Sequence, residues 1–243
     1  MKTLIIVQAR LGSSRLRGKV LKDISGKTML ARVLDRVKKS RLADEVIVAT
    51  TTNSEDEAIV QECKKLNVNF FRGSEEDVLD RYYQAACHFK ADAVVRITSD
   101  CPLIDPEVID RVIETFKKEK PDFASNAIVR TYPRGLDTEI MSLSALHSAW
   151  KKAEAPYERT HVTPFIRENS KLFRMVSITS TQNLSRYRWT VDTAEDLEFV
   201  RAVYQRFENN NDFDWQDVLD LLDLDPALVK INTDVRQKSL EEC

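Results

Sequence analysis

The chain has 243 residues, and two observations predict an α/β fold with a doubly wound, mostly parallel sheet. Segments with apolar residues at helical spacing alternate with short, mostly apolar runs. Such runs are typical of buried parallel strands, and they occur at 4–7, 45–50, 67–72 and 93–98. Strands and helices that alternate through short connections form right-handed crossovers, so the carboxyl ends of the strands should meet at one edge.

Helices are expected between these runs and after the last one. Ser54 stands where a side chain can cap the second helix. Asp105 followed by Pro106 is typical of an N-cap and a first helical position. The expected helices of the first half cover 29–37, 54–66, 77–89 and 106–118.

The second half of the chain is less regular. Short strands are expected at 123–126, 135–141, 171–178 and 187–191. Helices are expected at 143–153, 158–168 and 215–222, with Pro164 interrupting the second. The clearest helix covers 193–207, where Thr193 can cap the first turn and Asp196 has a capping-box-like position. Because linkers and repeats are absent from the sequence, we expect one domain over 1–243 with a small embedded α+β lobe at about 126–185.

Composition excludes several classes of partner. The formal net charge is −2, so no overall basic field favours nucleic acid. No apolar run approaches the roughly 18 residues that a membrane span needs. The first strand begins almost at once, without the pattern of a signal peptide. We therefore expect a cytoplasmic protein with no nucleic-acid and no membrane partner.

A loop rich in glycine, hydroxyls and cations follows the first strand. It contains Arg10, Gly12, Ser13, Ser14, Arg15, Arg17, Gly18 and Lys19. Backbone N–H groups and hydroxyls can donate to phosphate oxygens, while an arginine fork and the lysine charge neutralise them. The plain alternative is a solvated basic turn. The position of the loop at the carboxyl end of a strand favours phosphate binding, since ligands bind at that edge.

Two aspartates are expected at the same edge. Asp100 comes just after the run at 93–98, and Asp192 just after the run at 187–191. Alone, Asp100 would be a turn residue before Pro102, and Asp192 a residue favoured by a helix dipole. Together with the loop they predict a metal–nucleotide site, because Mg²⁺ takes carboxylate, phosphate and water oxygens.

The motifs resemble one enzyme family. The segment 9–19 reads A-R-L-G-S-S-R-L-R-G-K and resembles the A-R-x-x-S-x-R-L-P-G-K loop of the sugar-acid cytidylyltransferases, except that Arg17 replaces the proline. The segment 99–103 resembles the D-x-P metal segment of that family, and 191–197 its V/I-D-T-x-x-D-L segment. The segments 132–139 and 158–164 are similar to the spore-coat polysaccharide (SpsF-type) branch.

The resemblance implies a Rossmann-like, nucleotide-diphospho-sugar transferase fold. It implies one nucleotidyltransferase domain, whose embedded lobe serves dimerisation, in a homodimer. The implied reaction moves CMP from CTP to the anomeric hydroxyl of a 2-keto sugar acid and releases pyrophosphate, for surface or spore-coat polysaccharide synthesis. No covalent enzyme intermediate is implied, so catalysis would rest on positioning and electrostatics.

Site residues are assigned from the same resemblance. The catalytic residues are Arg10, Arg15, Lys19, Asp100 and Asp192. The nucleotide-binding residues are Gln8, Ala9, Arg10, Gly12, Ser13, Ser14, Arg15, Lys19, Arg72 and Asp100. The sugar-binding residues are Arg134, Glu139, Arg159 and His161. Asp100 and Asp192 would hold Mg²⁺.

Three alternatives stay open. A sugar-1-phosphate nucleotidyltransferase usually opens with a G-G-x-G-x-R-L loop, where this chain has Ala9 and Arg10. A glycosyltransferase of the same fold would carry a D-x-D motif, where this chain has Asp100-Cys101-Pro102. A non-catalytic assembly protein would have no need for Lys19, Asp100 and Asp192 together. A test with CTP, Mg²⁺ and candidate sugar acids separates these classes.

Overall fold

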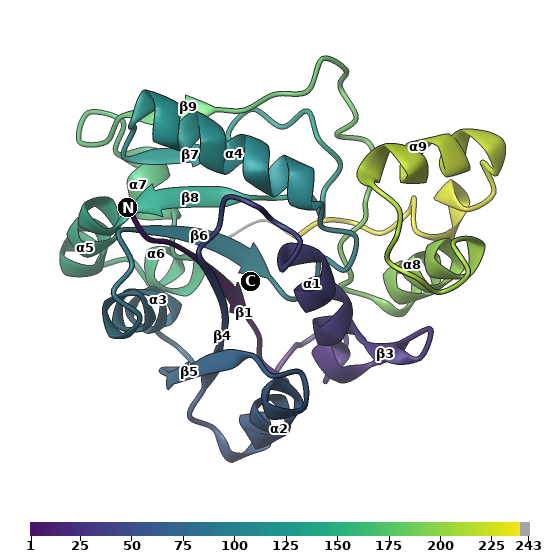
Figure 1. The fold of residues 1–243 in the computed structure, drawn as a ribbon, viewed down its shortest axis with the longest axis horizontal. Helices are drawn as coiled ribbons and strands as arrows, with labels where there is room; N and C mark the ends of the chain where they lie inside the picture. The colour runs from purple at the N-terminus through teal and green to yellow at the C-terminus, as the bar shows by residue number, and fades with distance from the viewer. Residues whose placement is uncertain (239–243) are drawn as a thin grey trace.

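The computed structural model describes residues 1–238 and confirms the α/β fold. A seven-stranded sheet has the order β5-β4-β1-β6-β8-β7-β9 (Figure 1). Strand β8 runs antiparallel to both neighbours, and the remaining pairs are parallel. The strands are β1 Thr3–Gln8, β4 Glu45–Thr51, β5 Asn69–Gly73, β6 Ala93–Thr98, β7 Phe123–Ser125, β8 Glu139–Ser142 and β9 Met175–Ser177. A small hairpin, β2 Asp23–Ile24 with β3 Lys27–Thr28, stands apart from the sheet.

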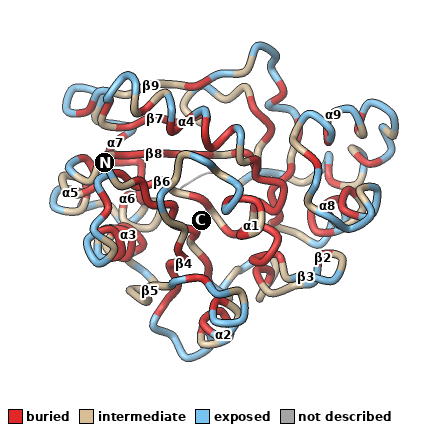
Figure 2. Tube along the Cα trace, viewed as in Figure 1, coloured by how far each residue is buried: buried red, intermediate tan, exposed pale blue. Residues whose placement is uncertain are grey.

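Helices cover both faces of the sheet. Because successive side chains of a strand point to opposite faces, Ile5 and Val7 of β1 enter one core and Leu4 and Ile6 the other. The first core also takes α1, α2, α4, α8 and α9, and the second takes α3, α5 and α7, while α6 lies against α3. The helices are α1 Met29–Val37, α2 Glu57–Lys65, α3 Val78–His88, α4 Pro106–Glu119, α5 Leu143–Lys152, α6 Pro156–His161, α7 Pro164–Glu168, α8 Ala194–Arg206 and α9 Trp215–Leu224. Figure 2 shows that the central strands are mostly buried and that exposure is concentrated on the outer turns.

The order of the strands creates a crevice beside β1. The chain passes from β1 to β4 and β5 on one side, and then returns to place β6 on the other side of β1. Gln8 at the end of β1 pairs with Thr98 at the end of β6. Ligands of open α/β sheets bind where the strand order reverses, outside the carboxyl ends of the strands. The opening loop and the segment after β6 both leave the sheet at this point.

Several expected helix boundaries are confirmed. The Asp105 side chain accepts hydrogen bonds from the amides of Glu107 and Val108, at 2.8 and 3.2 Å. Thr193 and Asp196 form a reciprocal capping box at the start of α8. The expected helix at 158–168 is divided into α6 and α7, and Pro164 is the first residue of α7.

The cap expected at Ser54 is wrong. Residues Ser54–Asp56 form a 3-10 turn, and α2 begins only at Glu57. Asp56 accepts hydrogen bonds from the Leu11 amide, at 2.8 Å, and from the Thr51 hydroxyl. These tertiary contacts hold the segment against the opening loop, which the local sequence pattern does not reveal.

The strand expected at 187–191 is also wrong. This segment makes a single parallel bridge, between Arg134 and Arg188, and the Val191 amide donates to the Asp100 carbonyl at 2.8 Å. Gly135 permits the close crossing. Its φ is +109°, and a Cβ there would lie 2.6 Å from the Trp189 carbonyl carbon. The segment therefore crosses the sheet edge as an extended connection and does not add a strand.

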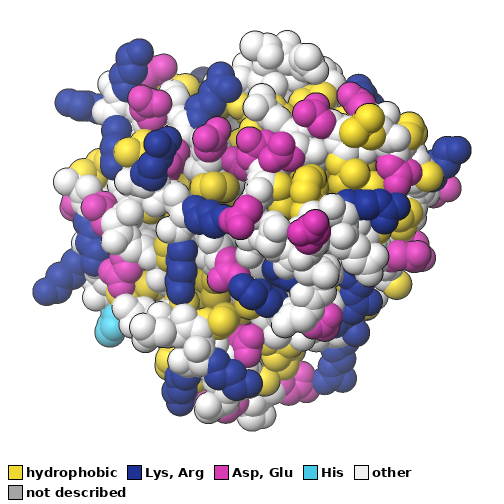
Figure 3. Space-filling model, turned by 45° about the vertical axis from the view of Figure 1, so that its right-hand side comes forward, with side chains coloured by type: hydrophobic (Ala, Val, Ile, Leu, Met, Phe, Trp, Pro, Cys, Tyr) yellow, Lys and Arg dark blue, Asp and Glu magenta, His cyan; other side chains and the backbone are white. Residues whose placement is uncertain are grey.

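The lobe expected at about 126–185 does not form a sheet of its own, since its strands β8 and β9 pair within the main sheet. Its role in dimerisation stays a prediction. Over residues 1–238, none of the helices combines the length and apolarity that crossing a membrane requires. Cationic and anionic side chains are interspersed over the face drawn in Figure 3, as the small net charge leads one to expect.

Candidate active site

Hydrogen bonds fix the opening loop (9–19) at both of its ends. The Leu11 amide donates to Asp56, and the Leu11 carbonyl accepts from the Gly18 amide at 3.0 Å. Gly18 has a left-handed φ of 67° and leads directly into a 3-10 turn at Lys19–Leu21. Glycine adopts this conformation without steric penalty. The loop thereby turns Lys19 back toward the crevice between β1 and β6.

Lys19 connects the two predicted carboxylates. Its Nζ donates to Asp100 Oδ2 at 2.8 Å, to Asp192 Oδ1 at 2.9 Å and to the Val191 carbonyl at 2.8 Å. Only 8% of the Lys19 residue is exposed. Three acceptors satisfy the three protons of the ammonium group. The segments after β1, after β6 and before α8 thus meet at one buried cation.

Charge keeps this cluster ionised. Burial lowers the pKa of Lys19, but the charges of Asp100 and Asp192 and their hydrogen bonds raise it above its usual range overall. Burial raises the pKa of Asp100, but the charge and hydrogen bond of Lys19 outweigh that effect and hold the pKa at about 2. At neutral pH the site therefore carries a protonated lysine and a deprotonated Asp100.

Two arginines also bind Asp192. Arg15 and Arg188 donate to Asp192 Oδ2 at 2.9 and 2.7 Å. Arg188 also binds Asp196, with its Nε 2.9 Å from Oδ1. Burial lowers the pKa of Arg188, but Asp196 and Asp192 raise it overall. Sequence reasoning missed Arg188, although its position four residues before Asp192 was a usable signal.

One pocket gathers most of the predicted nucleotide-binding residues. It is lined by Gln8, Ala9, Arg10, Ser13, Ser14, Arg15, Lys19, Val20, Arg81, Thr98, Ser99, Asp100, His161, Asp192 and Lys238. The predicted catalytic residues are all present. Gly12 belongs to the same loop but does not line the pocket. Arg17 points elsewhere and pairs with Glu55 at 2.6 Å.

Arg72 is not brought to this pocket. Its guanidinium donates to the carbonyls of Thr51 and Asn53 and to Glu57, each at 2.9 Å. These contacts hold the turn between β4 and α2. The structure therefore gives Arg72 contacts within the protein and does not place it against the predicted nucleotide site.

Arg81 lines the pocket and was not predicted. It lies on α3, is 1% exposed, and donates through Nη1 to the Ser74 carbonyl at 2.8 Å. Within residues 1–238 its buried Nε has no hydrogen-bond partner. Burial lowers the pKa of Arg81, and the charge of Arg10 adds to that effect. The available signal was a cation within a stripe of buried apolar residues on α3.

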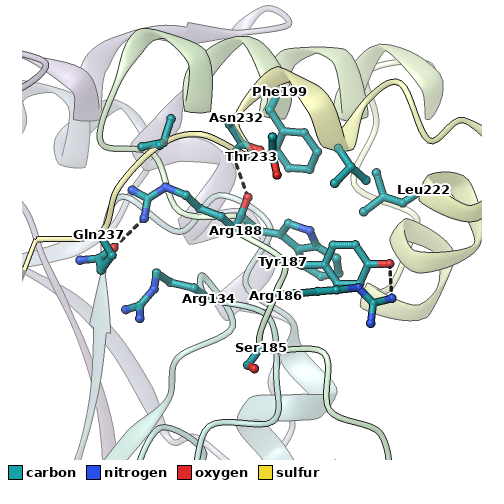
Figure 4. Close-up of a pocket in the computed structure, with 13 residues that line it drawn as sticks. Arg134, Ser185, Arg186, Tyr187, Arg188, Phe199, Leu222, Asn232, Thr233 and Gln237 are labelled. Atoms are coloured by element: carbon teal, nitrogen blue, oxygen red, sulfur yellow. Dashed lines mark hydrogen bonds between the residues drawn. The ribbon is translucent and has the colours of Figure 1, made fainter.

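The predicted sugar-binding residues are separated. Arg159 binds Asp77 and the Trp150 carbonyl, which ties α6 to α3 and α5. Glu139 is buried, accepts from Arg96 at 2.7 Å and does not line the pocket. His161 lines the nucleotide pocket. Arg134 lines a neighbouring pocket, drawn in Figure 4.

Asp100 and Asp192 are the residues of this site that could hold Mg²⁺ together with a substrate. Residues 1–238 contain no cluster of three or more His, Cys, Asp or Glu side chains that could hold a metal. Mg²⁺ is commonly bound by one or two carboxylates, with substrate phosphates and water as the other ligands. Asp100 Oδ2 binds Lys19, and Asp100 Oδ1 lies 3.5 Å from the Cys101 thiol. Cations already occupy both oxygens of Asp192, since Lys19 binds Oδ1 and both Arg15 and Arg188 bind Oδ2.

The fold and the site together define an α/β nucleotidyltransferase. The family model described as cytidylyltransferase matches residues 4–219, and the chain belongs to this family. The spore coat polysaccharide biosynthesis protein SpsF of Bacillus subtilis is 32% identical over 231 residues, 92% of this chain and 95% of that protein. The protein MJ1063 of Methanocaldococcus jannaschii is 42% identical over 100% of this chain and 99% of its own.

Solved structures agree with this assignment. A cytidylyltransferase from Leptospira borgpetersenii is 34% identical, with a TM-score of 0.92 over 98% of this chain and 100% of that one. A CMP:2-keto-3-deoxy-manno-octonic acid synthetase complexed with CTP shares the fold, with a TM-score of 0.63 at 21% identity over 85% of this chain and 100% of that one.

Proposed function

We propose that this cytidylyltransferase moves CMP from CTP to the anomeric hydroxyl of a 2-keto sugar acid and releases pyrophosphate. The observation that carries the proposal is the Lys19 ammonium, held between Asp100 and Asp192 under a loop of hydroxyls and cations. Such a site can bind a triphosphate and stabilise the charge that develops as pyrophosphate leaves. Membership of the cytidylyltransferase family, and the fold shared with a synthetase solved with CTP, support CTP as the donor.

Each group of the pocket has a proposed task. Arg10, Arg15 and the hydroxyls of Ser13 and Ser14 bind phosphate oxygens, and Lys19 faces the transferred phosphate. Backbone groups of 8–9, beside the end of β1, contact the cytosine. His161 contacts the sugar. Bound on the two aspartates and the phosphates, Mg²⁺ would supply charge neutralisation and orientation.

Pyrophosphate release tests the proposal. The purified protein is incubated with CTP, Mg²⁺ and a panel of 2-keto sugar acids, with ATP, GTP and UTP as nucleotide controls. We expect release with CTP and at least one acid, and a CMP-linked product by mass spectrometry. Release only with a sugar 1-phosphate and another nucleotide would overturn the proposal in favour of a sugar-1-phosphate nucleotidyltransferase. If no pyrophosphate is released with any pair of nucleotide and acceptor, the result would favour an assembly protein.

We also propose a homodimer that acts in the cytoplasm, in surface or spore-coat polysaccharide synthesis. The similarity to the spore-coat protein over 92% of the chain supports the pathway. Light scattering coupled to size exclusion measures the mass, which is 28.0 kDa for one chain. A single species at that mass would contradict the dimer.

A further inference from the structure

The chain returns to the active site after α9. From the end of α9 at Leu224 it passes through a 3-10 turn, Val229–Ile231, and then runs as an irregular segment to residue 238. Figure 1 shows this segment as a yellow trace that leaves the region of α8 and α9 towards the middle of the molecule. The family model ends at residue 219, so this return lies beyond the part of the chain that the model matches.

Two buried side chains anchor the start of the returning segment. Leu228 belongs to the first core, and Asn232 is also buried. The Asn232 side-chain amide donates to the Arg188 carbonyl (Figure 4) and to Asp196 Oδ1, each at 2.9 Å. Asp196 also accepts from the Asp192 amide at 2.9 Å. The anchor is thus fixed to the segment that carries Asp192.

The segment beyond this anchor is mostly exposed. Four of the six residues at 233–238 are exposed, and the other two are half-buried. The Gln237 side-chain oxygen accepts from Arg188 Nη1 at 2.6 Å (Figure 4). A segment with few buried contacts opens at a low cost in free energy. We therefore expect residues 233–238 to open and close while the sheet stays folded.

The end of this segment reaches the nucleotide pocket. Lys238 lines that pocket together with Arg15 and Lys19. It also lines a neighbouring hollow of about 570 Å³, between residues 231–238 and the start of α8. Among residues 1–238, Arg15 and Lys238 line both spaces, whereas Lys19 lines only the first of them. A polyphosphate that extends away from the phosphate at Lys19 therefore has room to continue towards Lys238.

The ammonium group of Lys238 is available to a ligand. Within residues 1–238 no ion pair engages it, whereas Lys19 and Arg15 both bind Asp192. A nucleoside triphosphate carries several negative charges, and cations beside its oxygens neutralise them. Protein carboxylates already balance part of the charge of Lys19 and Arg15. Lys238 therefore adds a cation that an anionic ligand can use in full.

We propose that residues 233–238 form a strap that closes over the triphosphate of the bound nucleotide, and that Lys238 binds the oxygens of its β- and γ-phosphates. This inference rests on the proposed transfer from CTP, and it adds a cation from outside the segment that the family model matches. The anchor at Asn232 and the bond from Arg188 to Gln237 hold the strap beside the site. A nucleoside monophosphate lacks the two outer phosphates, so it should not close the strap.

Affinity measurements test the role of Lys238. Calorimetry with Mg²⁺ and without an acceptor compares CTP, CMP and inorganic triphosphate. Lys238→Gln should raise the dissociation constants of CTP and of inorganic triphosphate about 10-fold, the effect of one lost hydrogen bond to a charged group. The dissociation constant of CMP should stay within about 2-fold, because CMP has no β- or γ-phosphate.

Lys230→Gln is the matched control. Lys230 is exposed in the anchored 3-10 turn and lines neither of the two spaces. The variant removes the same charge from the same part of the chain, and CTP affinity should stay within about 2-fold because solvent and salt screen an exposed charge. Equal effects of the two variants on CTP would overturn the role of Lys238. Equal weakening of CTP and CMP by Lys238→Gln would also overturn it, since the outer phosphates would then not be its ligands.

Hydrogen exchange tests the closure of the strap. Peptides that cover 233–238 are compared without ligand, with CMP and with CTP. CTP should slow the exchange of these amides, CMP should not, and Lys238→Gln should abolish the effect of CTP. Exchange that CTP leaves unchanged would overturn the strap. Equal slowing in the wild type and in Lys238→Gln would overturn the part of Lys238 in closing it.

Kinetics separate this inference from the proposed function. In a working cytidylyltransferase, Lys238→Gln should raise KM for CTP and leave KM for the acceptor within about 2-fold. CMP transfer with an unchanged KM for CTP would overturn the inference and leave the proposed function standing. Weaker binding of inorganic triphosphate by Lys238→Gln, in a protein that transfers no CMP, would overturn the proposed function alone.

Discussion

Replacing Lys19 by methionine tests the charge cluster most directly. The change keeps the length and the apolar stem of the side chain but removes the cation between Asp100 and Asp192. The pKa of Asp100 lies at about 2 in the folded protein, against 3.8 ordinarily. At about 1.4 kcal/mol per pKa unit, the environment of ionised Asp100 contributes on the order of 2 kcal/mol to the free energy of unfolding near neutral pH.

Without the Lys19 ammonium, the environment of ionised Asp100 destabilises the folded protein. Two carboxylates then share a site with little solvent, so breaking the buried pair should destabilise the protein by about 3 to 5 kcal/mol. Arg15 and Arg188 still bind Asp192 and keep the effect within that range. Transfer activity should fall by about 10²- to 10³-fold, because the cation expected at the transferred phosphate is gone.

The pH dependence gives the deciding measurement. A carboxyl whose pKa is lowered by folding stabilises the protein above its unfolded pKa, near 3.8, and that stability is lost as the pH falls through the folded value, about 2. Urea unfolding of the wild type and Lys19→Met should therefore differ most at about pH 7, and the difference should shrink towards about pH 3. Lys118→Met, on the exposed face of α4, is the control and should change stability by under about 0.5 kcal/mol. A difference that stays constant with pH would refute the ion-pair account.

Three further outcomes are expected. Asp192→Asn should lower kcat about 10²- to 10³-fold in the pyrophosphate assay while the circular dichroism spectrum stays unchanged. Arg17→Ala should change the urea midpoint and KM for CTP very little, because Arg17 is exposed and its pair with Glu55 is a surface ion pair worth about 0 to 1 kcal/mol. Gly135→Ala should destabilise the protein by about 2 kcal/mol or more, since its Cβ would meet the Trp189 backbone and its φ is +109°.

Each of these three predictions has an outcome that would contradict it. Unchanged turnover in Asp192→Asn would remove Asp192 from the reaction. A weakened affinity for CTP in Arg17→Ala would mean that Arg17 leaves Glu55 to bind phosphate. Wild-type stability in Gly135→Ala would show that the crossing of 134–135 over 188–190 can relax, with Pro133→Ala as a neighbouring control.

The first half of the fold was predictable because its signals are local. The apolar runs and the cap at Asp105 each depend on residues within a few positions. The second half was harder. The run at 187–191 has the composition of a strand, but backbone groups of Arg134 and Asp100 bind it from two sides, and it becomes a connection across the sheet edge.

The candidate site shows the same division. Lys19 and Asp100 are 81 positions apart, and their meeting followed from the rule that strand ends share one edge, whereas Asp192 reaches the same edge from an extended connection. Arg159 and Arg72 looked equally available as cations, but their partners were not visible in the sequence. Arg159 binds Asp77, 82 positions away, and Arg72 binds carbonyls of the turn after β4.

The sequence by itself determined the mostly parallel sheet, the opening loop of 9–19 and the edge at which Asp100 joins it. These follow from periodicity and short-range geometry. Only the tertiary structure decided which cations remain for a ligand. An arginine whose guanidinium binds a neighbouring carboxylate or carbonyl has fewer donors for a ligand, and these neighbours come from distant parts of the sequence. In the folded protein, Arg17 pairs with Glu55 and Arg188 binds Asp192, whereas Arg134 lines a pocket.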